Sequence, residues 1–137
     1  MAGTWTLQFP FRRSVGPVIG GFLAGLRDQR VVGARTTGGR VLVPPLEYDP
    51  DTGEATAGEV EVASAGVVEH AAWVSEPLRT HPTDQPFAWV LVKLDGADTA
   101  LLHIANTNVS VGDRVQIHWR AEREGKITDI EYFEAAK

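Results

Sequence analysis

The sequence has no cysteine among its 137 residues. Disulfide bonds, thiolate nucleophiles and thiolate zinc sites are therefore excluded. Long hydrophobic runs are also missing, since no stretch reaches the roughly eighteen apolar residues of a membrane-spanning helix. The first residues lack the ordered basic, apolar and small-residue regions of a secretory signal. We therefore expect a protein with no membrane partner, located in the cytoplasm.

Sequence signatures of catalysis are missing too. There is no Gly-x-Ser-x-Gly elbow, phosphate-binding loop or dinucleotide fingerprint. The segment DPDTGE at residues 49–54 resembles the start of a calcium loop, but Val60 stands where that loop needs a glutamate. We predict no catalytic residue and no metal ligand. None of the histidines has a partner at the spacing of a helical zinc site: His70, His81, His103 and His118.

Charge is distributed unevenly along the chain. The net charge is −5, and the apolar and charged shares of 43% and 23% are those of an ordinary globular protein. Residues 1–43 contain six arginines and one acidic residue, whereas residues 44–137 contain seven basic and seventeen acidic residues. A basic front on an acidic body indicates an interaction surface, but arginines that keep a glycine-rich apolar segment in solution would explain it equally well.

Apolar residues alternate near the N-terminus and then follow a helical spacing. The alternation predicts an extended arm with one apolar face, which Pro10 keeps at an edge or outside a sheet. A helix from about Val15 to Asp28 follows, with Ser14 as its N-cap, and its glycines make it depend on close packing. The helix can cover the chain's own core, contact a partner, or do both. The residues expected at a partner interface are Trp5, Leu7, Phe9, Phe11, Val18, Phe22 and Leu26.

The rest of the chain favours β structure. A hairpin is predicted between Val31–Ala34 and Arg40–Val43. From Gly58 onward, turn residues separate five strand candidates without an intervening helix, which is typical of a small Greek-key barrel of the OB type. Gly66 would permit a bend in the first strand, and Asp95-Gly96 is a strong hairpin signal. The candidates are Val60–Trp73, Phe87–Leu94, Thr99–Ile104, Arg114–Trp119 and Lys126–Phe133.

The order of these segments resembles the acyl-CoA-associated OB-fold proteins that carry an N-terminal rubredoxin-like zinc ribbon. Their pattern is an apolar helix, a Cys-x-x-Cys-Gly knuckle, a Val-x-Pro-Pro strand end, a second Cys-Pro-x-Cys-Gly knuckle and a barrel. The matching segments here are PVIGGFLAGLRD, RTTGG at residues 35–39, Pro44-Pro45, and DPDTG at residues 49–53. In the barrel the match covers PFAWVLVKLDG, VGDRVQIHW and ITDIEYFE.

The sequence departs from this family at the zinc ligands. Arg35, Gly38, Asp49 and Thr52 stand at or beside the four cysteine positions. Arginine and glycine side chains cannot ligate zinc, so we expect no zinc. Contacts with the barrel or with a partner then have to hold the ribbon-like segment.

The predicted architecture is therefore mainly β and has two parts. Residues 1–57 form an arm, a helix and a degenerate, metal-free ribbon-like segment. Residues 58–137 form the five-stranded OB-type Greek-key barrel.

The resemblance also implies a role. It implies a non-catalytic accessory subunit that binds a thiolase-fold enzyme and helps to position the CoA thioester, which is the substrate of the complex. The segments YDPDTGE and LDGADT are similar to the domain paired with thiolase-like aldolases of sterol side-chain degradation, which cleave a hydroxyacyl-CoA by a retro-aldol step. This chain would then need no cofactor of its own. The residues expected near the CoA phosphates are Arg12, Arg13, Arg35 and Arg40.

Two other functions stay open at the level of sequence. OB barrels bind single-stranded nucleic acid through stacked aromatic side chains, and Trp73, Trp89 and Trp119 could serve in this way. The barrel segment is acidic, however, and phosphate binding demands clustered basic residues, so we expect no nucleic acid. The third function is an independent active site assembled from His103, His118 and nearby acids.

Overall fold

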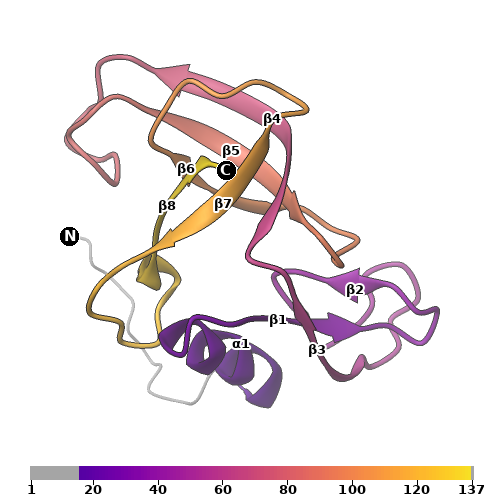
Figure 1. Ribbon diagram of the computed structural model, residues 1–137. Helices are drawn as coiled ribbons and strands as arrows, with labels where there is room; N and C mark the ends of the chain where they lie inside the picture. Colours follow the sequence, from indigo (N-terminus) through magenta and orange to yellow (C-terminus); the bar gives the residue numbers. More distant parts are fainter. Residues whose placement is uncertain (1–15, 137) are drawn as a thin grey trace.

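The computed structural model describes residues 16–136, and it shows a barrel above one helix and a small sheet (Figure 1). The helix is α1 (Pro17–Arg27), and a short 3-10 helix, η1 (Ile127–Asp129), precedes the last strand. Within the described range, no helix is long and apolar enough to cross a membrane. The strands are β1 (Val31–Arg35), β2 (Val41–Leu42), β3 (Ala57–Val62), β4 (Ala65–Val74), β5 (Phe87–Leu94), β6 (Leu101–Ala105), β7 (Arg114–Trp119) and β8 (Ile130–Ala135).

Strands β4 to β8 form the barrel, in the order β4-β5-β6-β8-β7. Neighbouring strands are antiparallel except β6 and β8, which run parallel where Ala105 lies opposite Phe133. Side chains alternate between the inside and outside of a strand, and Val90, Val92 and Leu94 of β5 accordingly fill the interior. The predicted OB-type barrel is confirmed.

The small sheet has the order β2-β1-β3 and corresponds to the ribbon-like segment. The predicted hairpin is confirmed, with Ala34 of β1 opposite Leu42 of β2. On its other side, β1 pairs with β3, which ends at Val62. The sheet therefore extends past the boundary predicted at residue 57.

The strand predicted from Val60 to Trp73 is two strands in the structure. The chain leaves the small sheet at the end of β3 and enters the barrel at Ala65. Gly66 then lies opposite Leu94, where a Cβ atom would collide with the carbonyl oxygen of Lys93. Gly66 thus permits a close approach of two backbones, while the irregularity in β4 falls later, between Val68 and His70.

Polar side chains join β2 to the barrel. The hydroxyl of Thr99 donates to the carbonyl oxygen of Val43 at 2.9 Å and accepts from the Val43 N–H at 2.7 Å. The Asp98 carboxylate accepts from the Val41 N–H at 2.8 Å, and the Asp98 N–H donates to the Val41 carbonyl at 2.8 Å. Both residues lie between β5 and β6, so this connection of the barrel holds the edge of the ribbon-like sheet.

Helix α1 packs against β1 and the loop before β8 (Figure 1). It begins at Pro17, where the missing N–H of proline costs nothing, whereas the predicted N-cap Ser14 lies outside the described residues. After its last turn, Gln29 adopts a left-handed conformation with φ of 61°, which turns the chain into β1. The guanidinium of Arg123 donates to the carbonyl oxygen of Arg27 at 2.8 Å and ties the helix end to the barrel.

Two strand boundaries also differ from the prediction. The Asp95-Gly96 turn does join β5 to β6, but β6 starts only at Leu101 because Asp98 and Thr99 form hydrogen bonds with Val41 and Val43. The segment predicted as a strand from Lys126 opens with the η1 turn, and pairing begins at Ile130.

Candidate functional site

The basic front that the sequence predicts, residues 1–43, is described by the structure from Gly16 onward. Arg35 ends β1 and Arg40 precedes β2, so the hairpin brings both arginines to one exposed tip. Arg40 forms an ion pair with Asp51 at 2.9 Å, and Arg35 donates to the carbonyl oxygen of Gly39 at 3.4 Å. Exposed pairs of this kind contribute little energy, so they leave the guanidinium groups able to exchange partners. The other two arginines proposed near CoA lie outside the described residues: Arg12 and Arg13.

The apolar residues predicted at a partner interface fall into three groups. Phe22 and Leu26 are buried in the chain's own core, with 4% and 0% of their surface exposed, because the helix stripe packs against β1 and the barrel. They therefore offer no surface to a partner. Val18 is half-buried and lines a small notch between α1 and β3. The remaining residues lie outside the described part of the chain: Trp5, Leu7, Phe9 and Phe11.

The two knuckle loops of the ribbon-like segment are joined by polar side chains. The Thr37 hydroxyl donates to a Glu54 carboxylate oxygen at 2.5 Å, alongside the Arg40–Asp51 pair. The buried Asp49 carboxylate accepts from the Asp51 N–H at 2.9 Å. Among the four knuckle positions, Asp49 alone has a carboxylate that could ligate a metal ion. This carboxylate already accepts the hydrogen bond from Asp51.

This donor set does not fit zinc. Arg35 and Gly38 supply no ligand, and the hydroxyl of Thr52 accepts from the Glu54 N–H at 3.2 Å. Throughout residues 16–136, no three side chains of the His, Asp and Glu type are arranged to hold a metal ion.

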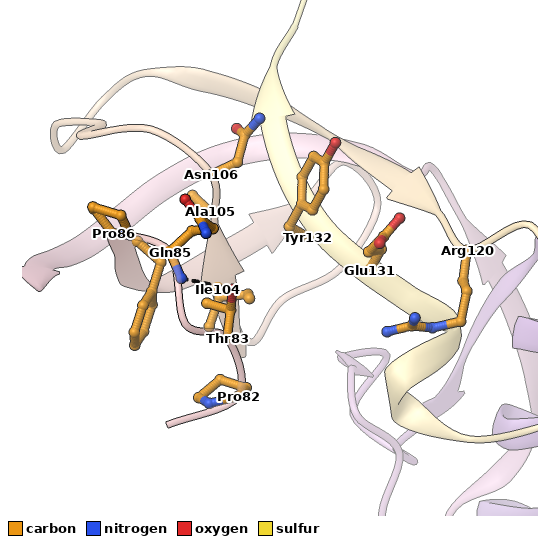
Figure 2. Close-up of a pocket in the computed structure, with 11 residues that line it drawn as sticks. Pro82, Thr83, Gln85, Pro86, Ile104, Ala105, Asn106, Arg120, Glu131 and Tyr132 are labelled. Carbon is orange, nitrogen blue, oxygen red and sulfur yellow. Dashed lines mark hydrogen bonds between the residues drawn. The ribbon is translucent and has the colours of Figure 1, made fainter. Parts of the chain in front are cut away.

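The barrel carries an open trough that the sequence did not predict. It consists of two adjoining pockets of about 430 Å³ and 330 Å³, which share Pro82, Ile104, Arg120 and Glu131. One wall is the loop before β5, the floor is β5 and β6, and the other wall is the segment from Arg120 to Tyr132. Figure 2 shows Arg120 and Glu131 on one side of the larger pocket, with Pro82, Thr83 and Gln85 on the other.

Arg120 is held in place at the centre of the trough. Its Nε–H donates to the carbonyl oxygen of Thr128 at 2.9 Å, and its main-chain N–H donates to the carbonyl oxygen of Asp129 at 2.9 Å. No carboxylate in the described range forms an ion pair with its guanidinium. The trough therefore presents an oriented positive charge that forms no ion pair with a carboxylate of residues 16–136.

A buried carboxylate fixes the loop that carries Arg120. Asp129 accepts from the backbone N–H groups of Glu124, Gly125 and Lys126 at 2.9, 2.7 and 3.2 Å. Burial by itself would raise the pKa of Asp129, but these donors and the nearby Arg123 together hold the pKa below its ordinary value. Asp129 is thus ionised in the folded protein and keeps this wall of the trough rigid.

The two histidines considered for catalysis are not brought together. His103 lies on β6 and His118 on β7, with β8 between these strands in the barrel. His118 stacks on Tyr132 and lies 3.5 Å from the carboxylates of Glu131 and Glu134. The site proposed from both histidines therefore has no geometric basis.

His103 has a structural role at the edge of the trough. Its Nδ1 accepts from the Ile104 N–H at 2.9 Å, and its Nε2 lies 3.3 Å from the carbonyl oxygen of Ile127. A carbonyl needs a donor, so this pair assigns a neutral ring with its proton on Nε2. Burial lowers the pKa of His103, which favours the same neutral form.

Comparison with known proteins adds a relationship at the level of fold. No protein-family model matches the sequence, and a comparison with curated proteins gives no match. One similar structure is a protein of unknown function from the DUF35 family of Sulfolobus solfataricus, with a TM-score of 0.68 and 22% identity over 89% of this chain and 85% of that chain. Another is the Ltp2-ChsH2(DUF35) aldolase, with a TM-score of 0.66 and 20% identity over 92% of this chain and 100% of that chain. The chain therefore has the fold of the DUF35 proteins, as the order of its sequence segments predicted.

Proposed function

We propose that this chain is a non-catalytic accessory subunit of a heteromeric aldolase. The observation that carries the proposal is the extent of the structural similarity, which spans 92% of this chain and the whole of the compared chain of the Ltp2-ChsH2(DUF35) aldolase. A match that includes the helix, the ribbon-like sheet and the barrel supports a shared way of assembly better than a match of barrels alone would.

The partner in this proposal is a thiolase-like subunit that supplies the catalytic base. The reaction is a retro-aldol cleavage of a hydroxyacyl-CoA from a sterol side chain. The base removes the hydroxyl proton, the carbon–carbon bond breaks to leave a carbonyl product, and the carbon next to the thioester takes up a proton. The exposed arginine tip of the β1–β2 hairpin supports a role beside the CoA phosphates, because guanidinium groups bind phosphate through paired donors.

Co-production with a thiolase-like protein encoded beside this chain tests the proposal. We expect the two proteins to elute together in size-exclusion chromatography, and we expect carbonyl product only when both are present. The partner alone serves as the first control and this chain alone as the second. Cleavage by the partner alone at the full rate, or separate elution of the two proteins, would contradict the proposal.

A further inference from the structure

The trough of the barrel combines an apolar half with a half that carries several polar side chains, and Arg120 and Glu131 line both halves. Arg120 lines both pockets, as does Ile104 on the floor. The apolar half is lined by Trp89, Leu102, Ile127 and Ile130. The polar half is lined by Thr83, Gln85, Asn106 and Tyr132 (Figure 2).

The position of the trough in the fold indicates a binding role. In OB barrels, ligands bind across the second and third strands, between the loop that joins the first two strands and the loop that joins the last two. Here β5 and β6 are the second and third strands, and the two loops are residues 75–86 and 120–129. The trough lies between these loops, so it occupies the face on which OB barrels bind their ligands.

The open shape of the trough favours a polypeptide over a small molecule. Small-molecule pockets cover about 70–90% of their ligand. Here Leu102 and Ile127 stand at the rim with 57% and 40% of their surface exposed, and the polar half opens beside exposed Gln85 and Asn106. An extended polypeptide could place an apolar side chain in one half and pair its main-chain amides with the side-chain amide of Asn106 in the other.

The charge of the trough determines what that segment must carry. Arg120 has no carboxylate partner in the described range, and guanidinium groups form their strongest hydrogen bonds with carboxylates and phosphates. A single arginine beside Glu131 does not provide the clustered positive charge that a nucleic-acid backbone needs. A carboxylate side chain is therefore the complementary group.

We propose that the trough binds an extended segment of the partner subunit, with an apolar side chain over Trp89 and Leu102 and a carboxylate on Arg120. This inference rests on the proposed function, since it assumes the heteromeric complex. It places a partner contact on the barrel, apart from the β1–β2 hairpin that is proposed to lie beside the CoA phosphates.

The test measures the affinity of the purified full chain for the co-encoded thiolase-like partner by isothermal titration calorimetry. Arg120→Glu reverses the proposed contact charge, and Leu102→Asp places a charge in the apolar half. Both side chains are exposed, so the variants are expected to fold, which circular dichroism checks. Lys93→Glu and Val111→Asp are matched controls, because both residues are exposed and lie outside the trough.

The outcomes distinguish a failure of the trough proposal from a failure of the accessory-subunit function. The proposal expects Arg120→Glu and Leu102→Asp each to weaken binding at least tenfold, with both controls close to wild type. If wild type binds and all four variants bind equally, the trough proposal is overturned while the accessory-subunit function stands. If wild type does not bind the partner, both are overturned. Binding of a single-stranded oligothymidylate that depends on Arg120 would also overturn the trough proposal, in favour of nucleic acid.

Discussion

At the scale of single residues, Gly66 shows how close backbone approach limits the sequence. A Cβ at this position would collide with the carbonyl oxygen of Lys93 and with the Cα of Leu94, and neither can move without disturbing the β4–β5 pairing. We expect Gly66→Ala to lower the free energy of unfolding by about 3 kcal/mol, at the upper end of overpacking penalties. Gly38→Ala is the matched control, because its Cβ would meet only Thr36 at an ordinary 3.8 Å. Chemical denaturation measures both, and equal stabilities would contradict the prediction.

Asp129 is the residue that fixes the wall of the trough. Asp129→Asn keeps the size of the side chain but replaces one acceptor oxygen by a donor, which faces backbone N–H groups. We expect a loss of about 2–4 kcal/mol in urea unfolding, since hydrogen bonds to a charged group contribute about 1.5–3 kcal/mol. Glu122→Gln, an exposed change in the same loop, is the control and is expected to have little effect. A wild-type stability for Asp129→Asn would show that the loop does not depend on this carboxylate.

His103 gives the fold a dependence on pH. The unfolded chain binds a proton at the ordinary histidine pKa of 6.5, whereas burial lowers the pKa of His103 in the folded protein. Between these two values the unfolded state holds more protons, so stability is present above pH 6.5 and is lost as the pH falls toward the folded pKa. We expect His103→Gln to reduce this loss, measured as the difference in unfolding free energy between pH 7.5 and 5.5. An identical loss in the variant and wild type would contradict this role.

At the scale of elements, the sequence predicted best those strands that have a clear turn at each end. β5 and β7 match the predicted ranges because clear turns bound both segments, the first an apolar run and the second an alternating pattern. The prediction of one continuous strand from Val60 to Trp73 was wrong. The spacing of apolar residues does not show that the chain leaves one sheet and enters another between β3 and β4. The trough was missed for the same reason: Arg120 lies far in sequence from Trp89 of β5, and only barrel closure brings the two residues to one pocket.

The ribbon-like sheet should keep its structure without metal. The exposed Arg40–Asp51 pair contributes little energy. The buried side chains of Val41 and Val43, and the hydrogen bonds between Thr99 and Val43, are therefore the main support. We expect elemental analysis to find no stoichiometric zinc, and we expect excess EDTA to leave the melting temperature unchanged. Thr99→Val should lower that temperature, because it leaves backbone groups of Val43 without a partner. One zinc per purified chain, or unfolding by EDTA, would contradict the prediction.

At the scale of the whole molecule, the two surfaces for which functions are proposed lie on different parts of the fold. The arginine tip of the β1–β2 hairpin belongs to the ribbon-like sheet, while the trough belongs to the barrel. If the tip lies beside the CoA phosphates, it contributes to substrate binding, whereas a trough that binds the partner would contribute to assembly. A kinetic measurement on the assembled complex can tell these contributions apart.

The double variant Arg35→Ala/Arg40→Ala is therefore expected to raise KM for the CoA substrate severalfold and to leave kcat nearly unchanged. Phosphates distant from the reacting carbon are bound equally in the ground and transition states, so their loss weakens binding without changing the chemical step. The effect should shrink at high ionic strength, because salt screens exposed charges. Arg30→Ala is the control, since Arg30 is exposed near Glu61 at the opposite end of β1. If KM is unchanged while the complex stays intact, the hairpin arginines do not face the phosphates, and the basic front would then serve solubility or assembly alone.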